Sequence, residues 1–311
     1  MTLHLGVKSD PIESRYSFGW LFDIMKGCGV HRLQMGTSFP VFFAADEHFR
    51  GLRRSAEAKG IRITSMFTSH RELGFANADP LLNDAVRRGW ERVIHVAALI
   101  GAESVGSNAC IVLRDQPETR EPGLRTFAEN MKDLLALARA SGLKALTLEP
   151  MSSLYELPST PEEVRSILEE LGAWHGSHAE ATVPLQLCGD ISHGIADSEG
   201  RIVHDNWSLF EMQIPWMREF HFKNTDPIFN TTFGFGPGER KKGIVDLARF
   251  KGLIGANAGR FPCGELTGYL EIGGPKLGRD YSDRRLERML VESLQALTAV
   301  FIEGENTSWS T

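Results

Sequence analysis

Four residues with carboxylate or imidazole side chains lie in or at the end of short apolar runs, where they could bind a divalent cation. Glu149 ends ALTLE, Asp190 ends LQLCGD, His221 lies in REFHFKN and Glu271 lies in GYLEIGG. Each residue alone has an ordinary structural explanation, such as a loop cap, a partner for an arginine or a hydrogen-bonded core histidine. Unpaired burial of all four would be unfavourable, and a metal removes that cost. We therefore interpret the four as one metal-ligand set.

The chemistry of this ligand set limits which metal it would bind. Three carboxylates and one imidazole, with no thiolate, favour Mn²⁺, Mg²⁺ or Co²⁺ over a structural zinc ion. We expect one divalent ion, with Mn²⁺ as the preferred metal. The four cysteines form no CxxC pair and suit a reducing compartment.

The ligands can converge only if the runs that carry them are neighbouring parallel strands. Eight short apolar runs alternate with longer amphipathic segments, at residues 3–7, 32–35, 62–67, 104–107, 145–149, 185–189, 219–222 and 268–272. Several of the intervening helices are predicted to end at a glycine, at Gly60, Gly101 and Gly142. Alternating strands and helices favour parallel pairing with right-handed crossovers.

Eight such units predict an α/β fold, a single (β/α)8 TIM barrel over residues 1–303, with a C-terminal tail at residues 304–311. A doubly wound open sheet is the alternative, but no GxGxxG motif follows the first strand. The segment Ser159-Thr160-Pro161-Glu162-Glu163 predicts a helix start, with a capping hydroxyl, an early proline and acidic residues in the first turn. Residues 225–245 are glycine-rich and are expected to form a long loop.

Composition indicates which classes of protein are excluded. Hydrophobic residues make up 42% and charged residues 24% of the 311 residues, and the net charge is −6. This balance argues against a nucleic-acid-binding protein. The chain shows neither a signal peptide nor an apolar run long enough to span a membrane, so we expect a cytoplasmic protein.

The order Glu, Asp-x-x-His, His, Glu on strands five to eight resembles the xylose-isomerase-like TIM-barrel family of sugar epimerases and isomerases, including the ketose 3-epimerases. By that resemblance, Glu149, Asp190, His221 and Glu271 hold the metal, and His193 contacts a substrate oxygen. The segments LTLEPMSSLYELP, LCGDISHGIAD, EFHFKNTDPIFNTTFGF and GYLEIGGPKLGRDYSD resemble more narrowly the erythrulose-phosphate (tetrulose-phosphate) 3-epimerases of erythritol catabolism. One departure is that KNTDPIFNTT lacks the arginine that commonly follows strand seven in ketose epimerases.

The resemblance implies an isomerase that acts on a small ketose phosphate, L-erythrulose 1-phosphate being converted to D-erythrulose 1-phosphate. We expect Glu149 and Glu271 to exchange a proton on opposite faces of a cis-enediolate whose charge the metal stabilises. Further substrate contacts are expected near the strand ends, with Arg71 and Lys223 as the preferred phosphate ligands. The full set of expected substrate-binding residues is His193, His70, Arg71, Asn108, Lys223 and Lys8.

Other functions remain open at the level of sequence. Aldose–ketose isomerisation of a sugar or sugar phosphate uses the same enediolate chemistry. A metal-dependent phosphoester hydrolase of the endonuclease-IV-like branch would need more histidines at strand ends and a basic face. A non-catalytic sugar-phosphate sensor could keep the ligands without needing two glutamates and His193. The expected partner is a small sugar or sugar phosphate, with no nucleic acid or membrane, and a homo-oligomer is possible.

Overall fold

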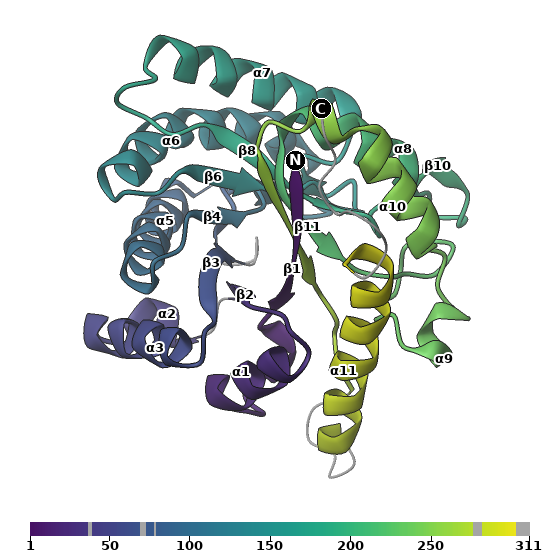
Figure 1. The fold of residues 1–311 in the computed structure, drawn as a ribbon. Helices are drawn as coiled ribbons and strands as arrows, with labels where there is room; N and C mark the ends of the chain where they lie inside the picture. Colours follow the sequence, from purple (N-terminus) through teal and green to yellow (C-terminus); the bar gives the residue numbers. More distant parts are fainter. Residues whose placement is uncertain (37–38, 69–72, 78, 276–281, 303–311) are drawn as a thin grey trace. The chain divides into compact units, whose positions relative to one another are not determined.

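Eight parallel strands pair in the order β1-β12-β11-β8-β6-β4-β3-β2 and close as a barrel (Figure 1). The structure is a computed structural model that describes the chain except residues 37–38, 69–72, 78, 276–281 and 303–311. The barrel confirms the predicted (β/α)8 fold. Its strands are β1 (Thr2–Lys8), β2 (Arg32–Gly36), β3 (Arg62–Phe67), β4 (Ser104–Ser107), β6 (Ala145–Leu148), β8 (Leu185–Asp190), β11 (Met217–Phe222) and β12 (Glu265–Leu270).

Helices connect the strands along the chain, as the alternating pattern predicted. They are α1 (Phe18–Gly27), α2 (Phe39–Phe43), α3 (Asp46–Ala58), α5 (Pro80–Ile100), α6 (Arg120–Ala140), α7 (Pro161–Ser177), α8 (Asn206–Gln213), α9 (Pro237–Arg240), α10 (Leu247–Ala256) and α11 (Ser282–Phe301). Short 3₁₀ turns lie at η1 (Asp10–Ile12), η2 (Pro117–Thr119), η3 (Ile214–Trp216) and η4 (Ala258–Arg260). None of the helices in the described residues is long and apolar enough to cross a membrane.

The eight predicted strands are confirmed, and the last one differs most in its limits. It was expected at residues 268–272, whereas β12 is Glu265–Leu270. The strand starts three residues earlier than predicted because its hydrogen-bonded pairing with β1 already begins at Thr2 opposite Glu265. Glu271 therefore follows β12 instead of lying within it, although its backbone N–H still donates to Phe222 of β11 at 3.0 Å.

The predicted helix ends are also confirmed. Gly60, Gly101 and Gly142 have φ angles of 74°, 79° and 84°, the left-handed conformation that disfavours residues with a Cβ atom. Thr160 caps α7: its hydroxyl accepts from the Glu163 N–H, and the Glu163 carboxylate accepts from the Thr160 N–H. This reciprocal arrangement is a capping box.

The predicted long loop at residues 225–245 contains local structure. Asn224 and Phe233 form an isolated antiparallel bridge, and α9 lies within the glycine-rich segment. Two small antiparallel sheets also lie outside the barrel strands. They are formed by β5 (Cys110–Ile111) with β7 (Glu156–Leu157), and by β9 (Ile195–Ala196) with β10 (Ile202–His204).

The contacts within the chain divide it into two compact units, which we describe separately. The first unit comprises residues 1–35, 54–62 and 189–311, and the second comprises residues 36–53 and 63–188. In the first, Phe250 of α10 packs with its ring centroid 5.0–6.1 Å from those of four other phenylalanines. In the second, Phe127 of α6 packs edge-on against Phe75 at 6.3 Å. Burial of such aromatic side chains stabilises each unit.

Candidate active site

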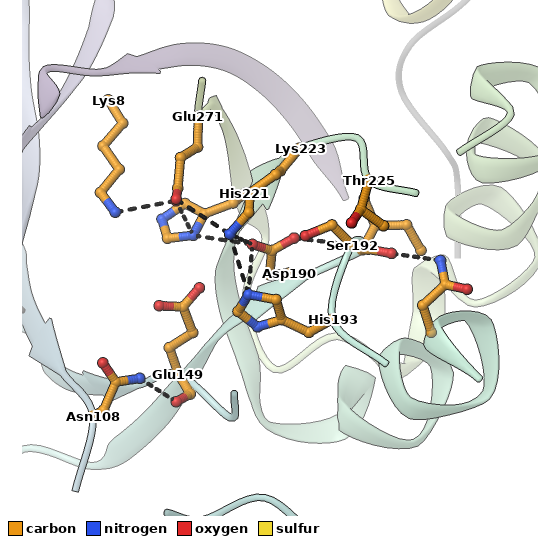
Figure 2. Close-up of polar contacts among 12 residues, drawn as sticks. Lys8, Asn108, Glu149, Asp190, Ser192, His193, His221, Lys223, Thr225 and Glu271 are labelled. Atoms are coloured by element: carbon orange, nitrogen blue, oxygen red, sulfur yellow. Dashed lines mark hydrogen bonds and ion pairs between the residues drawn. The ribbon is translucent and has the colours of Figure 1, made fainter. Parts of the chain in front are cut away.

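Three of the predicted metal ligands lie together in the first unit, at the carboxyl ends of three strands (Figure 2). Asp190 is the last residue of β8, His221 lies near the end of β11, and Glu271 directly follows β12. His221 Nδ1 lies 2.9 Å from Glu271 Oε2 and 3.9 Å from Asp190 Oδ2. His221 and Asp190 are almost completely buried, whereas the Glu271 side chain is 16% exposed.

Two lysines bring positive charge to these carboxylates. Lys223 Nζ lies 3.0 Å from Asp190 Oδ2 and 3.3 Å from Glu271 Oε1, and Lys8 Nζ lies 3.1 Å from Glu271 Oε2. Burial alone would raise the pKa of Glu271, but the charges of Lys223 and Lys8 outweigh it and hold that pKa well below its ordinary value. The carboxylate of Glu271 is therefore ionised and tightly held.

Asp190 also organises the turn that follows β8. Its Oδ1 accepts a hydrogen bond from the Ser192 N–H at 2.8 Å, and its Oδ2 lies 3.3 Å from His193 Nε2. Burial acts to raise the pKa of Asp190, but the neighbouring charges of His193 and Lys223 lower it below the ordinary value. His193 also lies 3.2 Å from Lys223 Nζ, so this histidine and lysine adjoin the same carboxylate.

Glu149 belongs to the second unit and follows β6. Its backbone N–H donates to Ser107 at 3.3 Å, and the Asn108 side-chain amide donates to the Glu149 carbonyl at 2.6 Å. Glu149 is 5% exposed. Asn108, predicted as a substrate contact, thus holds the backbone from which the Glu149 side chain extends (Figure 2).

The donor atoms fit a divalent cation. Glu149, Asp190, His221 and Glu271 each offer one ligand atom, and these atoms lie within 4.8 Å of one another. Three carboxylate oxygens and one imidazole nitrogen form a hard donor set. The ammonium group of Lys223, which lies between two of the carboxylates, shows that this position favours positive charge.

Seven of the predicted site residues lie close together. They are the four ligand residues and Lys8, His193 and Lys223, which lie against the carboxylates. His70 and Arg71 lie outside the described residues. The sequence analysis did not identify Gln34, whose Oε1 lies 2.7 Å from His221 Nε2. The signal that could have found it is a polar residue between the apolar Leu33 and Met35 in the strand RLQMG.

Comparisons with solved structures give the same fold. A structure from Rhodospirillum rubrum ATCC 11170, described as a candidate xylose isomerase, has 19% sequence identity and a TM-score of 0.77, covering 96% of this chain and 99% of its own. The D-psicose 3-epimerase of Clostridium cellulolyticum H10, solved with D-tagatose, has 15% identity and a TM-score of 0.69, covering 96% and 99%. The IolI protein, solved with a zinc atom, has 13% identity and a TM-score of 0.68, covering 97% and 100%.

Comparison at the level of sequence identifies the family. Among proteins with curated descriptions, none matches this chain. A family model described as the xylose isomerase-like TIM barrel matches residues 24–258, which is most of the chain. The protein belongs to the xylose isomerase-like TIM barrel family.

Proposed function

We propose that this protein is a divalent-metal-dependent epimerase of a small ketose phosphate, with L-erythrulose 1-phosphate as the substrate and D-erythrulose 1-phosphate as the product. The observation that carries the proposal is the set of four ligand atoms from Glu149, Asp190, His221 and Glu271, all within 4.8 Å of one another. A sugar-processing family and an epimerase among its structural relatives support the class of reaction. The substrate rests on the resemblance of the four strand-end segments.

Epimerisation next to a carbonyl requires removal of a proton from carbon and its return to the opposite face. The metal we propose is Mn²⁺. Held by the four ligands, it would offset the negative charge that develops on the substrate oxygens. We assign the proton transfers to Glu149 and Glu271, one for each face of the substrate. His193 and Lys223, which adjoin Asp190, are assigned to hydrogen bonds with substrate oxygens.

The lysines impose a condition on this mechanism. Glu271 is ion-paired with both Lys8 and Lys223, and its low pKa makes it a weak base in that arrangement. For Glu271 to accept a proton, at least one ammonium group must turn from the carboxylate to a substrate oxygen or phosphate. Substrate binding would thus both occupy the lysine and restore the basicity of the glutamate.

The phosphate ligands remain part of the proposal. Lys223 contacts Asp190 and Glu271 directly, so it can bind phosphate only after it leaves one of them. Arg71 is the other proposed phosphate ligand. Removal of both charges should raise KM for the phosphorylated ketose far more than for the free sugar.

The test is proton NMR of erythrulose 1-phosphate in D₂O with the purified enzyme, using Mg²⁺ because it is diamagnetic. We expect metal-dependent loss of the C3 proton signal. Glu271→Gln and Glu149→Gln should each slow this exchange by about 10²–10⁴-fold. The matched control is Glu265→Gln, at the opposite end of β12, where the carboxylate is exposed and pairs with Arg32 at 2.8 Å.

The outcomes separate the parts of the proposal. Exchange with another ketose or ketose phosphate, but not with erythrulose 1-phosphate, would discard the substrate and keep the chemistry. Interconversion with an aldose would replace epimerisation by aldose–ketose isomerisation. Absence of exchange with every sugar despite bound metal would refute the enediolate mechanism.

A further inference from the structure

Gln34 is a buried residue on β2 whose amide contacts the proposed metal ligand His221 at the ring nitrogen that faces away from the carboxylates. Gln34 and His221 both have no solvent exposure, and Gln34 Oε1 lies 2.7 Å from His221 Nε2. Burial of a primary amide in a barrel strand is unfavourable unless its polar atoms are hydrogen-bonded. The contact with His221 therefore supplies a reason for a glutamine at this position.

The direction of this hydrogen bond determines which imidazole nitrogen is available. An amide oxygen has no proton to donate, so His221 Nε2 must carry the proton of the Nε2···Oε1 bond. When a cation is bound, the lone pair of the neutral ring lies on Nδ1. Nδ1 is the nitrogen on the side of the carboxylates, 2.9 Å from Glu271 Oε2 and 3.9 Å from Asp190 Oδ2.

The backbone holds Gln34 in this position. Gln34 lies opposite Lys8 in the parallel pairing of β1 with β2, and its carbonyl accepts from the Ser9 N–H at 3.0 Å. Lys8 itself reaches Glu271 Oε2 at 3.1 Å. The pairing of the first two strands thus positions both the Lys8 ammonium group beside Glu271 and the Gln34 amide oxygen beside His221 Nε2.

We propose that Gln34 is a positioning residue that holds His221 as the Nε2–H tautomer and directs Nδ1 toward a divalent cation. The proposal rests on the metal site of the proposed function. An acceptor on the distal nitrogen fixes the ring orientation and increases the basicity of the ligating nitrogen. Loss of such a partner typically weakens metal binding by about 10–100-fold.

The variants are Gln34→Leu, which removes the hydrogen-bond acceptor, and Gln34→Glu, which replaces the amide oxygen with a carboxylate oxygen that can still accept. We expect the dissociation constant for Mn²⁺, measured by titration calorimetry, to rise about 10–100-fold in Gln34→Leu. In Gln34→Glu it should stay at the wild-type value. Gln213→Leu is the matched control, because Gln213 is also a buried glutamine of the first unit and its Oε1 has no hydrogen-bond partner among the described residues. That control should bind Mn²⁺ like the wild type.

Histidine ¹H–¹⁵N correlation spectra of the wild-type protein, metal-free and loaded with diamagnetic Zn²⁺, provide a readout that does not depend on any variant folding. We expect a proton on His221 Nε2 in both states. An unprotonated Nε2, or equal Mn²⁺ affinity of Gln34→Leu and the wild type, would overturn the inference. If the wild type binds no metal, the proposed function fails, while the metal-free spectrum still decides whether His221 Nε2 carries the proton that Gln34 accepts.

Discussion

Replacement of Lys223 by methionine tests whether this lysine supplies the positive charge that the ligand carboxylates need. Lys223 is 3.0 Å from Asp190 Oδ2 and 3.3 Å from Glu271 Oε1, and its side chain is only 12% exposed. Methionine preserves most of the side-chain volume and removes the charge. Loss of one partner from a buried ion pair typically costs about 3–5 kcal/mol, because the remaining charge stays buried without compensation.

This cost converts into a measurable change in melting temperature. The entropy of unfolding is about 2.1 cal/mol/K per residue, or about 0.65 kcal/mol/K for 311 residues. The metal-free variant should therefore melt about 5–8 °C below the wild type, as measured by calorimetry. Lys132→Met is the matched control: Lys132 pairs with Glu170 at the surface at 3.1 Å, and exposed pairs contribute about 1 kcal/mol or less.

Metal should reverse part of this loss. A cation bound by Asp190 and Glu271 replaces the missing charge, and it no longer competes with the Lys223 ammonium group. The rise in melting temperature on addition of Mn²⁺ should therefore be larger in Lys223→Met than in the wild type. The reasoning is refuted if the metal-free variant melts within about 1 °C of the wild type, or if Mn²⁺ stabilises it less than the wild type.

Three further predictions concern the scaffold. Thr160→Ala removes the hydroxyl that accepts from the Glu163 N–H and should lower the free energy of unfolding by about 1 kcal/mol; an unchanged urea midpoint would contradict the capping role. Phe250→Ala leaves a cavity among four phenylalanine rings and should cost about 3–5 kcal/mol, with Phe250→Leu as the milder comparison in the same denaturation assay. Burial raises the pKa of the Cys110 thiol to about 12, so only about 10⁻⁴ of it is thiolate at pH 8. Mass mapping should find Cys110 unmodified by a disulfide reagent in the folded protein at pH 8, and rapid modification would show that the site opens.

The sequence was sufficient to predict the fold and to propose a set of ligand residues, because both rest on local patterns. Short apolar runs separated by amphipathic segments and glycine caps specify strands and helices, and their alternation specifies parallel pairing. Parallel strands place their carboxyl ends at one face of a barrel. Polar residues at the ends of four consecutive runs could therefore be grouped by residue type alone. The last strand was misplaced by up to three residues, because only its pairing with β1 sets where the hydrogen-bonded ladder begins.

The partners of these residues could be found only in the tertiary structure. Gln34 and His221 are separated by 187 positions, and Lys8 and Glu271 by 263, and no periodicity in a sequence relates residues so far apart. The sequence likewise presented Lys223 and Asn108 as groups facing a substrate. The structure directs Lys223 toward two carboxylates and Asn108 toward the Glu149 backbone. Residue type determined which chemistry was possible, whereas the closure of the barrel decided which charges meet, because ionic and hydrogen-bonded contacts depend on distances that the fold alone sets.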